Sequence, residues 1–290
     1  MGVYLLGTDE LGRDVFARML QGAWVSLSVG FVAVGIAVFI GILLGGLAGY
    51  YGQNPIRVGE VLIAALVIWM ALGWGKLSTL ILVVLALAAV AIAAVLVVQR
   101  DSYSRGLLHV FSAHFLSVDM VITGLIDIML CFPSFFLILT VVALLPASIY
   151  NIMIVIGITS WMGAARFVRA EFLSLREQDF VAAAQALGVP DWRIIFRHMV
   201  PNAIAPVLVS ATIGIAGAIL TEAGLSFLGF GVPPPDATWG NILSDGKNYL
   251  FDAPWLTFIP GIAILVVVLS FNLFGEGLRD ILNPKLRERH

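Results

Sequence analysis

Long apolar stretches recur along this chain of 290 residues, and they limit its possible folds more than any other feature. A helix needs about 20 mostly apolar residues to cross the hydrocarbon core of a bilayer. Seven stretches are predicted to be membrane spans: Trp24–Tyr50, Val61–Trp74, Leu77–Val98, Met120–Leu145, Ile149–Val168, Ala203–Leu220 and Phe258–Phe274. The second is short, and a proline breaks the fourth. The pattern predicts an all-α integral membrane protein, a polytopic helical bundle of about six to seven spans.

The composition excludes several other classes of protein. Hydrophobic residues make up 60% of the chain and charged residues 12%, well below the roughly 25% charged of a soluble domain. This excludes a soluble globular domain and a disordered chain, and the net charge of −2 argues against a partner nucleic acid. The single cysteine, Cys131, excludes a disulfide framework. We expect no metal and no cofactor, since His109 and His114 lie on different faces of a helix.

The distribution of basic residues predicts the orientation. Lys and Arg are enriched in the cytoplasmic loops of membrane proteins. Seven spans put the termini on opposite sides, and an inner C-terminus places twelve of the 16 basic residues on the cytoplasmic side. The sequence therefore predicts a cytoplasmic C-terminus and an outer N-terminus.

The longest connection on the predicted cytoplasmic side covers residues 169–202. Strong helix formers over Glu171–Leu187 predict a helix, and Gly188 is a natural residue to end it. Asp191 is suited to cap a second short helix, and Pro201 to close it. A connection this long indicates a function of its own, because most connections in compact proteins are short.

The surface of this connection is typical of a docking element. Phe180 and Trp192 are large apolar anchors, Arg193 flanks them, and Ala183 and Ala184 allow another surface to approach closely. Short helices with aromatic anchors outside the bilayer favour the docking of a soluble partner. The alternative is an interfacial helix that lies on lipid headgroups.

The same segment resembles the EAA loop of ABC-importer permeases. That pattern reads Glu-Ala-Ala, three residues, Gly, and then a proline further on. Ala183, Ala184, Gly188 and Pro201 fall in register, whereas Ala182 stands where the family has Glu. The loss of a largely exposed ion pair at that position is worth about 0–1 kcal/mol.

Three further segments carry the resemblance. Gly7–Asp14 reads Gly-Thr-Asp-Glu-Leu-Gly-Arg-Asp, Thr221–Gly229 matches the segment after the penultimate span, and Asn272–Pro284 resembles the C-terminal end. Together they identify the chain, over residues 1–52 and 118–290, as a member of the dipeptide/oligopeptide/nickel permease family, in its DppC/OppC branch. Family members normally have a span ahead of the first segment, so we expect either a missing span or a truncated start.

This resemblance implies a fold like that of type I ABC-importer permeases. The function it implies is half of a translocation pathway for peptides or a related small substrate such as nickel, in the cytoplasmic membrane of a bacterium or archaeon. The implied partners are a homologous second permease subunit, two cytoplasmic ATPase subunits, an extracytoplasmic substrate-binding protein and membrane lipid. The 169–202 connection would be the coupling loop that contacts the ATPases.

Two rival functions are weighed against this one. The chain has no Gly-x4-Gly-Lys-Ser/Thr phosphate loop, so its energy must come from a partner chain or from an ion gradient. A secondary transporter driven by an ion gradient usually shows internal repeats, and we find no convincing repeat. A membrane enzyme would need a nucleophile and a base, and no plausible set is present.

The expected organisation has four parts. Residues 1–23 form an outer N-terminal segment, 24–52 the first span, 53–117 an inserted hairpin with an interfacial helix, and 118–290 the permease core. The insertion has no counterpart in the resemblance. Within the core, residues 222–257 form an outer loop in which Trp239–Leu250 predicts an amphipathic helix. That helix would lie beneath a substrate-binding protein or plug the outer mouth of the bundle.

Three residues are candidates for the pathway or its gating. Asp127 lies inside a predicted span and Glu222 just past the end of another, so each would line the pathway or pair inside the bundle. Pro133 is expected to kink its span. We favour a structural or gating role for these residues over proton coupling.

Overall fold

The computed structural model describes residues 4–52, 55–56 and 116–282, and the chain divides into two compact units. One unit combines the residues up to Tyr50 with those from Leu125 onward, and the other covers Tyr51–Gly124. In the second unit, β1 (Pro55–Ile56) pairs antiparallel with β2 (Leu116–Ser117). The predicted spans Val61–Trp74 and Leu77–Val98 lie outside the described residues, as does the predicted interfacial helix.

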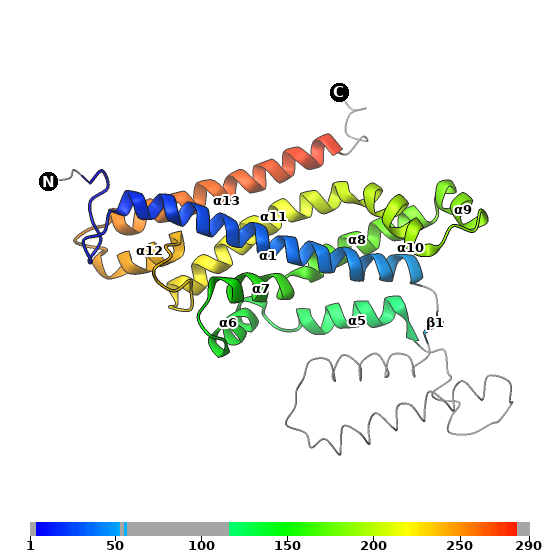
Figure 1. The fold of residues 1–290 in the computed structure, drawn as a ribbon, viewed down its shortest axis with the longest axis horizontal. Coiled ribbons are helices and arrows are strands. Elements are labelled where there is room, and N and C mark those ends of the chain that lie inside the picture. The colour runs from blue at the N-terminus through cyan, green and yellow to red at the C-terminus, as the bar shows by residue number, and fades with distance from the viewer. Residues whose placement is uncertain (1–3, 53–54, 57–115, 283–290) are drawn as a thin grey trace, which may run out of the picture. The chain divides into compact units, whose positions relative to one another are not determined.

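Five long helical segments match the five spans predicted for the described residues (Figure 1). They are α1 (Val15–Tyr51), the pair α5 (Val118–Leu130) and α6 (Ser134–Leu144), the pair α7 (Ile149–Thr159) and α8 (Trp161–Arg176), α11 (Val200–Phe227) and α13 (Trp255–Leu282). Four of these segments are long and apolar enough to cross a membrane, and α5 with α6 makes a fifth if the bent pair counts as one span. The all-α membrane fold is therefore confirmed, with one two-residue strand pair added.

Shorter helices connect these spans at both ends of the larger unit. At one end lie α9 (Asp179–Ala186), α10 (Asp191–Arg193) and a π-helical turn, Ile194–Met199. At the other end lie α12 (Trp239–Gly246) and a 3₁₀ turn, Lys247–Tyr249. Figure 1 shows α12 beside the start of α1, and α9 and α10 near the opposite end of the same helix.

The first span is longer than predicted, because α1 begins at Val15 and not at Trp24. The polar side chains of Arg18 and Gln21 interrupt the apolar pattern in its first two turns. The carboxylate of Asp14 accepts a hydrogen bond from the Phe16 N–H at 2.9 Å, which satisfies one of the free donors at the helix start.

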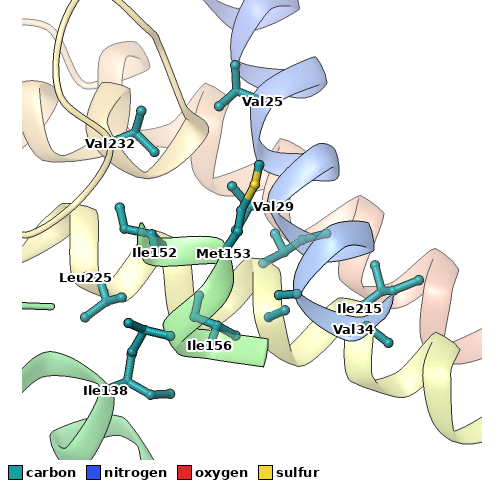
Figure 2. Close-up of a cluster of buried hydrophobic side chains, with 14 of the residues drawn as sticks. Val25, Val29, Val34, Ile138, Ile152, Met153, Ile156, Ile215, Leu225 and Val232 are labelled. Atoms are coloured by element: carbon teal, nitrogen blue, oxygen red, sulfur yellow. The ribbon is translucent and has the colours of Figure 1, made fainter. Parts of the chain in front are cut away.

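The core joins α1, α6, α7 and α11 (Figure 2). Val29, Ile152, Ile156, Ile219 and Leu225 are each at most 2% exposed. In contrast, large apolar side chains on other faces of the spans are exposed, for example Phe39, Ile213 and Leu273. Apolar outer faces on long helices are what a lipid environment requires.

Glycines bring α1 into close contact with α8. Gly41, Gly45 and Gly49 recur every four residues and so share one face of α1. A Cβ at Gly41 would lie 2.6 Å from the Cβ of Ala164 and 2.9 Å from the backbone nitrogen of Ala165. Small residues on a span allow another helix to approach closely, and the helix that packs on this face is the chain's own α8.

Candidate functional site

Gly188 ends α9 in the manner predicted for a glycine after a helix. Its φ of +72° lies in the left-handed region. Its N–H donates to the carbonyl of Gln185 at 2.9 Å, and the Val189 N–H donates to the carbonyl of Ala184 at 3.1 Å. These two bonds form a Schellman motif, so local backbone chemistry defines the turn.

The helix predicted before Gly188 is wrong in its extent. In place of one helix over Glu171–Leu187, α8 ends at Arg176 and α9 begins at Asp179. The residues between them cap α8 through Glu177, whose N–H donates back to the carbonyl of Leu175. The loop therefore contains a separate helix of eight residues with a turn at each end.

The second predicted helix also differs. The residue at the N-cap of α10 is Pro190, so Asp191 is the first residue of the helix and not its cap. Pro201 does not close the helix, because it lies in the first turn of α11, which continues to Phe227. The segment from Asp191 therefore runs through the π-helical turn directly into the next span.

Burial divides the apolar side chains of this loop into two sets. Val181 and Ala184 are at most 8% exposed, so they face the protein. Ala183 is exposed. The exposed large apolar side chains of the loop are Phe180, Leu187, Trp192 and Phe196, at 37%, 83%, 59% and 52%. We call Ala183 and these four residues the docking surface.

Arg193 adds charge beside the docking surface. Its guanidinium carbon lies 5.2 Å from the centre of the Trp192 ring, a distance typical of a cation–π contact. The side chain of Arg197 is also exposed. The loop therefore presents apolar and basic groups together.

Tyr50 ties this loop to the end of α1. Its hydroxyl donates to the Asp191 carboxylate at 2.8 Å and accepts from the Gln185 side-chain amide at 3.4 Å. The Arg176 guanidinium donates to the Tyr50 carbonyl at 3.2 Å. Sequence reasoning missed this residue, because a tyrosine at the end of a span usually indicates an interfacial anchor.

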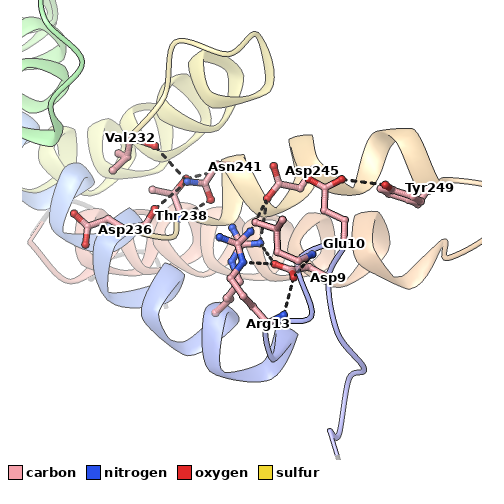
Figure 3. A network of polar contacts seen from close by, with 11 residues as sticks. Asp9, Glu10, Arg13, Val232, Asp236, Thr238, Asn241, Asp245 and Tyr249 are labelled. Atoms are coloured by element: carbon pink, nitrogen blue, oxygen red, sulfur yellow. Dashed lines mark hydrogen bonds and ion pairs between the residues drawn. The ribbon is translucent and has the colours of Figure 1, made fainter. Parts of the chain in front are cut away.

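At the other end of α1, the Gly7–Asp14 segment folds around one carboxylate (Figure 3). Asp9 accepts hydrogen bonds from the backbone N–H groups of Leu11 and Arg13 at 3.0 and 2.8 Å. Gly7 and Gly12 have φ values of +75° and +72°, which explains the glycines in this motif.

Two arginines connect Asp9 to α12. Arg18 donates to Asp9 at 2.7 Å and to Asp245 at 3.0 Å, and Arg13 pairs with Asp9 at 2.7 Å. Burial favours the neutral form of Asp9, but the backbone N–H and the guanidinium of Arg13, with the charge of Arg18, outweigh it and lower the pKa of Asp9 below its usual value. The motif therefore holds α12 by ion pairs.

The predicted amphipathic helix of the outer loop is confirmed as α12, which is shorter than predicted. Thr238 and Asn241 form a capping box at its start. Trp239 is 5% exposed, and its indole N–H donates to the carbonyl of Met19 at 3.1 Å. Trp239 therefore packs against α1, whereas Gly240 packs against α11 and Gly246 against α13.

The three predicted pathway residues have different surroundings. Glu222 is fully buried, and one of its carboxylate oxygens accepts a hydrogen bond from Ser226 of the same helix at 2.6 Å, while the other has no hydrogen-bond partner among the described residues. Asp127 pairs with Arg166 of α8 at 2.8 Å, and both side chains are more than half exposed. Pro133 precedes α6 at a bend of 81° between α5 and α6, as predicted for a kink.

A cavity of about 660 Å³ is lined by residues of α8, α11 and α13. Its wall is mostly apolar, with an acidic group at Glu171, a basic group at Arg279 and an amide at Asn202. None of the three predicted pathway residues lines it.

Residues 107–288 match the family described as the binding-protein-dependent transport system inner membrane component. The chain belongs to this family. It is 37% identical to the dipeptide transport system permease protein DppC of Alkalihalophilus pseudofirmus, over 97% of this chain and 72% of that protein. It is 32% identical to the oligopeptide transport system permease protein OppC of Bacillus subtilis, over the same shares of the two chains.

The fold agrees with this membership. An inward-facing structure of the MetNI methionine ABC transporter aligns with a TM-score of 0.51 over 91% of this chain and 96% of that one. At 15% identity, that likeness concerns the fold alone. As an inner membrane component of a binding-protein-dependent transport system, the protein is a multi-pass permease subunit. The family supports this function over the alternative hypotheses of a secondary transporter and a membrane enzyme.

Proposed function

We propose that this permease subunit forms half of the translocation pathway of an ATP-driven peptide importer, with the 169–202 loop as its contact with the ATPases. The relatives named as dipeptide and oligopeptide permeases support peptides as the substrate class. The observation that carries the proposal is the docking surface. Four large apolar side chains are exposed in the loop between α8 and α11, which is costly unless a partner covers them.

The proposed assembly has one permease partner, two ATPases and one substrate-binding protein. The distribution of basic residues supports a cytoplasmic docking surface and an outer α12. The 660 Å³ cavity would then open toward the cytoplasmic half of the pathway. Its opposite charges at Glu171 and Arg279 on apolar walls suit a peptide, which carries an amine, a carboxylate and varied side chains.

Co-purification of the whole importer tests this proposal. Ala183→Trp adds bulk to the exposed face of α9, so we expect the ATPases to be lost while the chain still inserts in the membrane. Asn248→Trp is the matched control, because Asn248 is exposed in the 3₁₀ turn that follows α12, and α12 lies at the opposite end of the larger unit from α9 (Figure 1). If Ala183→Trp still co-purifies with the ATPases and shows full peptide uptake, the loop is not the contact with the ATPases and is better described as a helix on the lipid surface.

A further inference from the structure

Tyr50 lies where three segments of the loop meet the end of α1. Gln185 is in the last turn of α9 and Asp191 begins α10, so the Tyr50 hydroxyl bonds both sides of the Gly188 turn. The Tyr50 carbonyl accepts from Arg176, the last residue of α8. One residue of the first described span therefore contacts the end of α8 and both helices of the loop.

The ring of Tyr50 is held firmly in this position. The residue is only 6% exposed, although Gln185 and Asp191 are exposed residues of the loop. A phenol hydroxyl both donates and accepts, so a single oxygen satisfies the carboxylate and the amide at once. Movement of either loop helix must therefore stretch these bonds or move Tyr50 with it.

The backbone beside Tyr50 cannot move independently of α8. Gly49 packs so closely on Phe172 and Arg169 that no Cβ fits between the two helices. Gly45 packs in the same way on the backbone of Ala165, one turn earlier. A displacement of Tyr50 must therefore move α1 and α8 together.

We infer that Tyr50 passes movement of the loop to the α1–α8 pair, as a positioning residue that couples ATP hydrolysis to transport. This inference rests on the proposed function, since it requires the ATPases to act on the loop. Docking and coupling are separate properties of the loop. The docking surface decides whether an ATPase binds, and Tyr50 decides how much of its movement reaches the spans.

The test is Tyr50→Phe in the complete importer, reconstituted in liposomes with its binding protein and peptide. The variant keeps the buried ring and removes only the hydroxyl. We expect the ATPases to co-purify at wild-type levels and the peptide transported per ATP hydrolysed to fall five- to tenfold. Tyr249→Phe is the matched control, because it removes a single hydroxyl bond, to Glu10 at 3.0 Å, at the other end of the larger unit.

A second pair of variants separates coupling from simple loss of stability. Asp191→Asn keeps an oxygen that accepts from Tyr50, so we expect transport per ATP close to wild type. Asp191→Leu removes the acceptor, and we expect the same loss of coupling as in Tyr50→Phe.

Three outcomes would overturn the inference. If Tyr50→Phe transports as much peptide per ATP hydrolysed as the wild type, the hydroxyl does not transmit movement of the loop. In that case, ATPase binding would still support the proposed function. Loss of the ATPases from Tyr50→Phe would show that Tyr50 only shapes the docking surface. An equal loss of coupling in Tyr249→Phe would show a general effect of destabilisation. The proposed function is tested separately by Ala183→Trp, and it fails if the ATPases still bind to that variant.

Discussion

The contact between α1 and α8 permits a sharp test of stability. A Cβ at Gly45 would lie 3.0 Å from the Cα and carbonyl carbon of Ala165 and closer still to its oxygen. These are backbone atoms, so no side-chain rotation relieves the clash. The helices must separate by roughly 0.5–1 Å, which forfeits a quarter to a half of the dispersion energy of each contact along the face. Overpacking of this kind costs about 1–3 kcal/mol.

Gly45→Ala is therefore expected to lower the unfolding temperature by about 2–12 °C, since 1 kcal/mol corresponds to about 2–4 °C for a chain of this size class. Gly35→Ala is the matched control, because Gly35 lies in the same helix with no atom within 4 Å of the added Cβ. It should leave the unfolding temperature unchanged or raise it slightly, as alanine favours helix over glycine by about 0.5–1 kcal/mol. The assay is heating of the detergent-purified protein followed by size-exclusion chromatography. Equal unfolding temperatures for the two variants would refute the close contact.

The remaining predictions concern the turn, the ion pairs and the orientation. Gly188→Val forces a branched residue to φ +72°, so we expect a cost of about 1 kcal/mol or more, normal membrane insertion and reduced uptake. The pKa of Asp9 is lowered in the folded protein, so its stabilisation is present at neutral pH and is lost as the pH falls through that lowered pKa. Asp9→Asn should thus unfold at a lower temperature than wild type at pH 7, with a gap that closes below about pH 4. In a Cys131→Ser background, a cysteine at Lys247 should react with an impermeant reagent from outside and one at Arg197 should not, and the reverse pattern would overturn the orientation.

The spans and the turn could be predicted because their causes are local. Twenty apolar residues predict a span wherever they occur, and Gly188 followed by Val189-Pro190 predicts the end of a helix. The structure confirms the turn and the five predicted spans that fall in the described residues. The bend at Pro133 follows from the same local rule, since proline cannot continue the hydrogen bonding of a helix.

The faces of α9 could not be predicted, because they depend on what packs against them. Ala183 and Ala184 are chemically identical neighbours, yet the first is exposed and the second is 8% exposed. An eight-residue helix is too short for its apolar pattern to decide which face turns inward. The ion pair between Arg18 and Asp245 joins positions 227 residues apart in sequence. A local sequence pattern cannot predict a contact between residues so far apart.

The same helix carries the contacts at both ends of the larger unit. Arg18, in the first turns of α1, is bound to Asp9 and Asp245, and Tyr50, near its last residue, is bound to the loop. The 37 residues between Val15 and Tyr51 form one helix without a break, about 55 Å long at 1.5 Å per residue. Because an unbroken helix resists bending and Gly41, Gly45 and Gly49 join it to α8, movement at the loop is not absorbed along the way. We therefore expect a displacement that begins at the docking surface to be felt at α12, where α1 is fixed by charge.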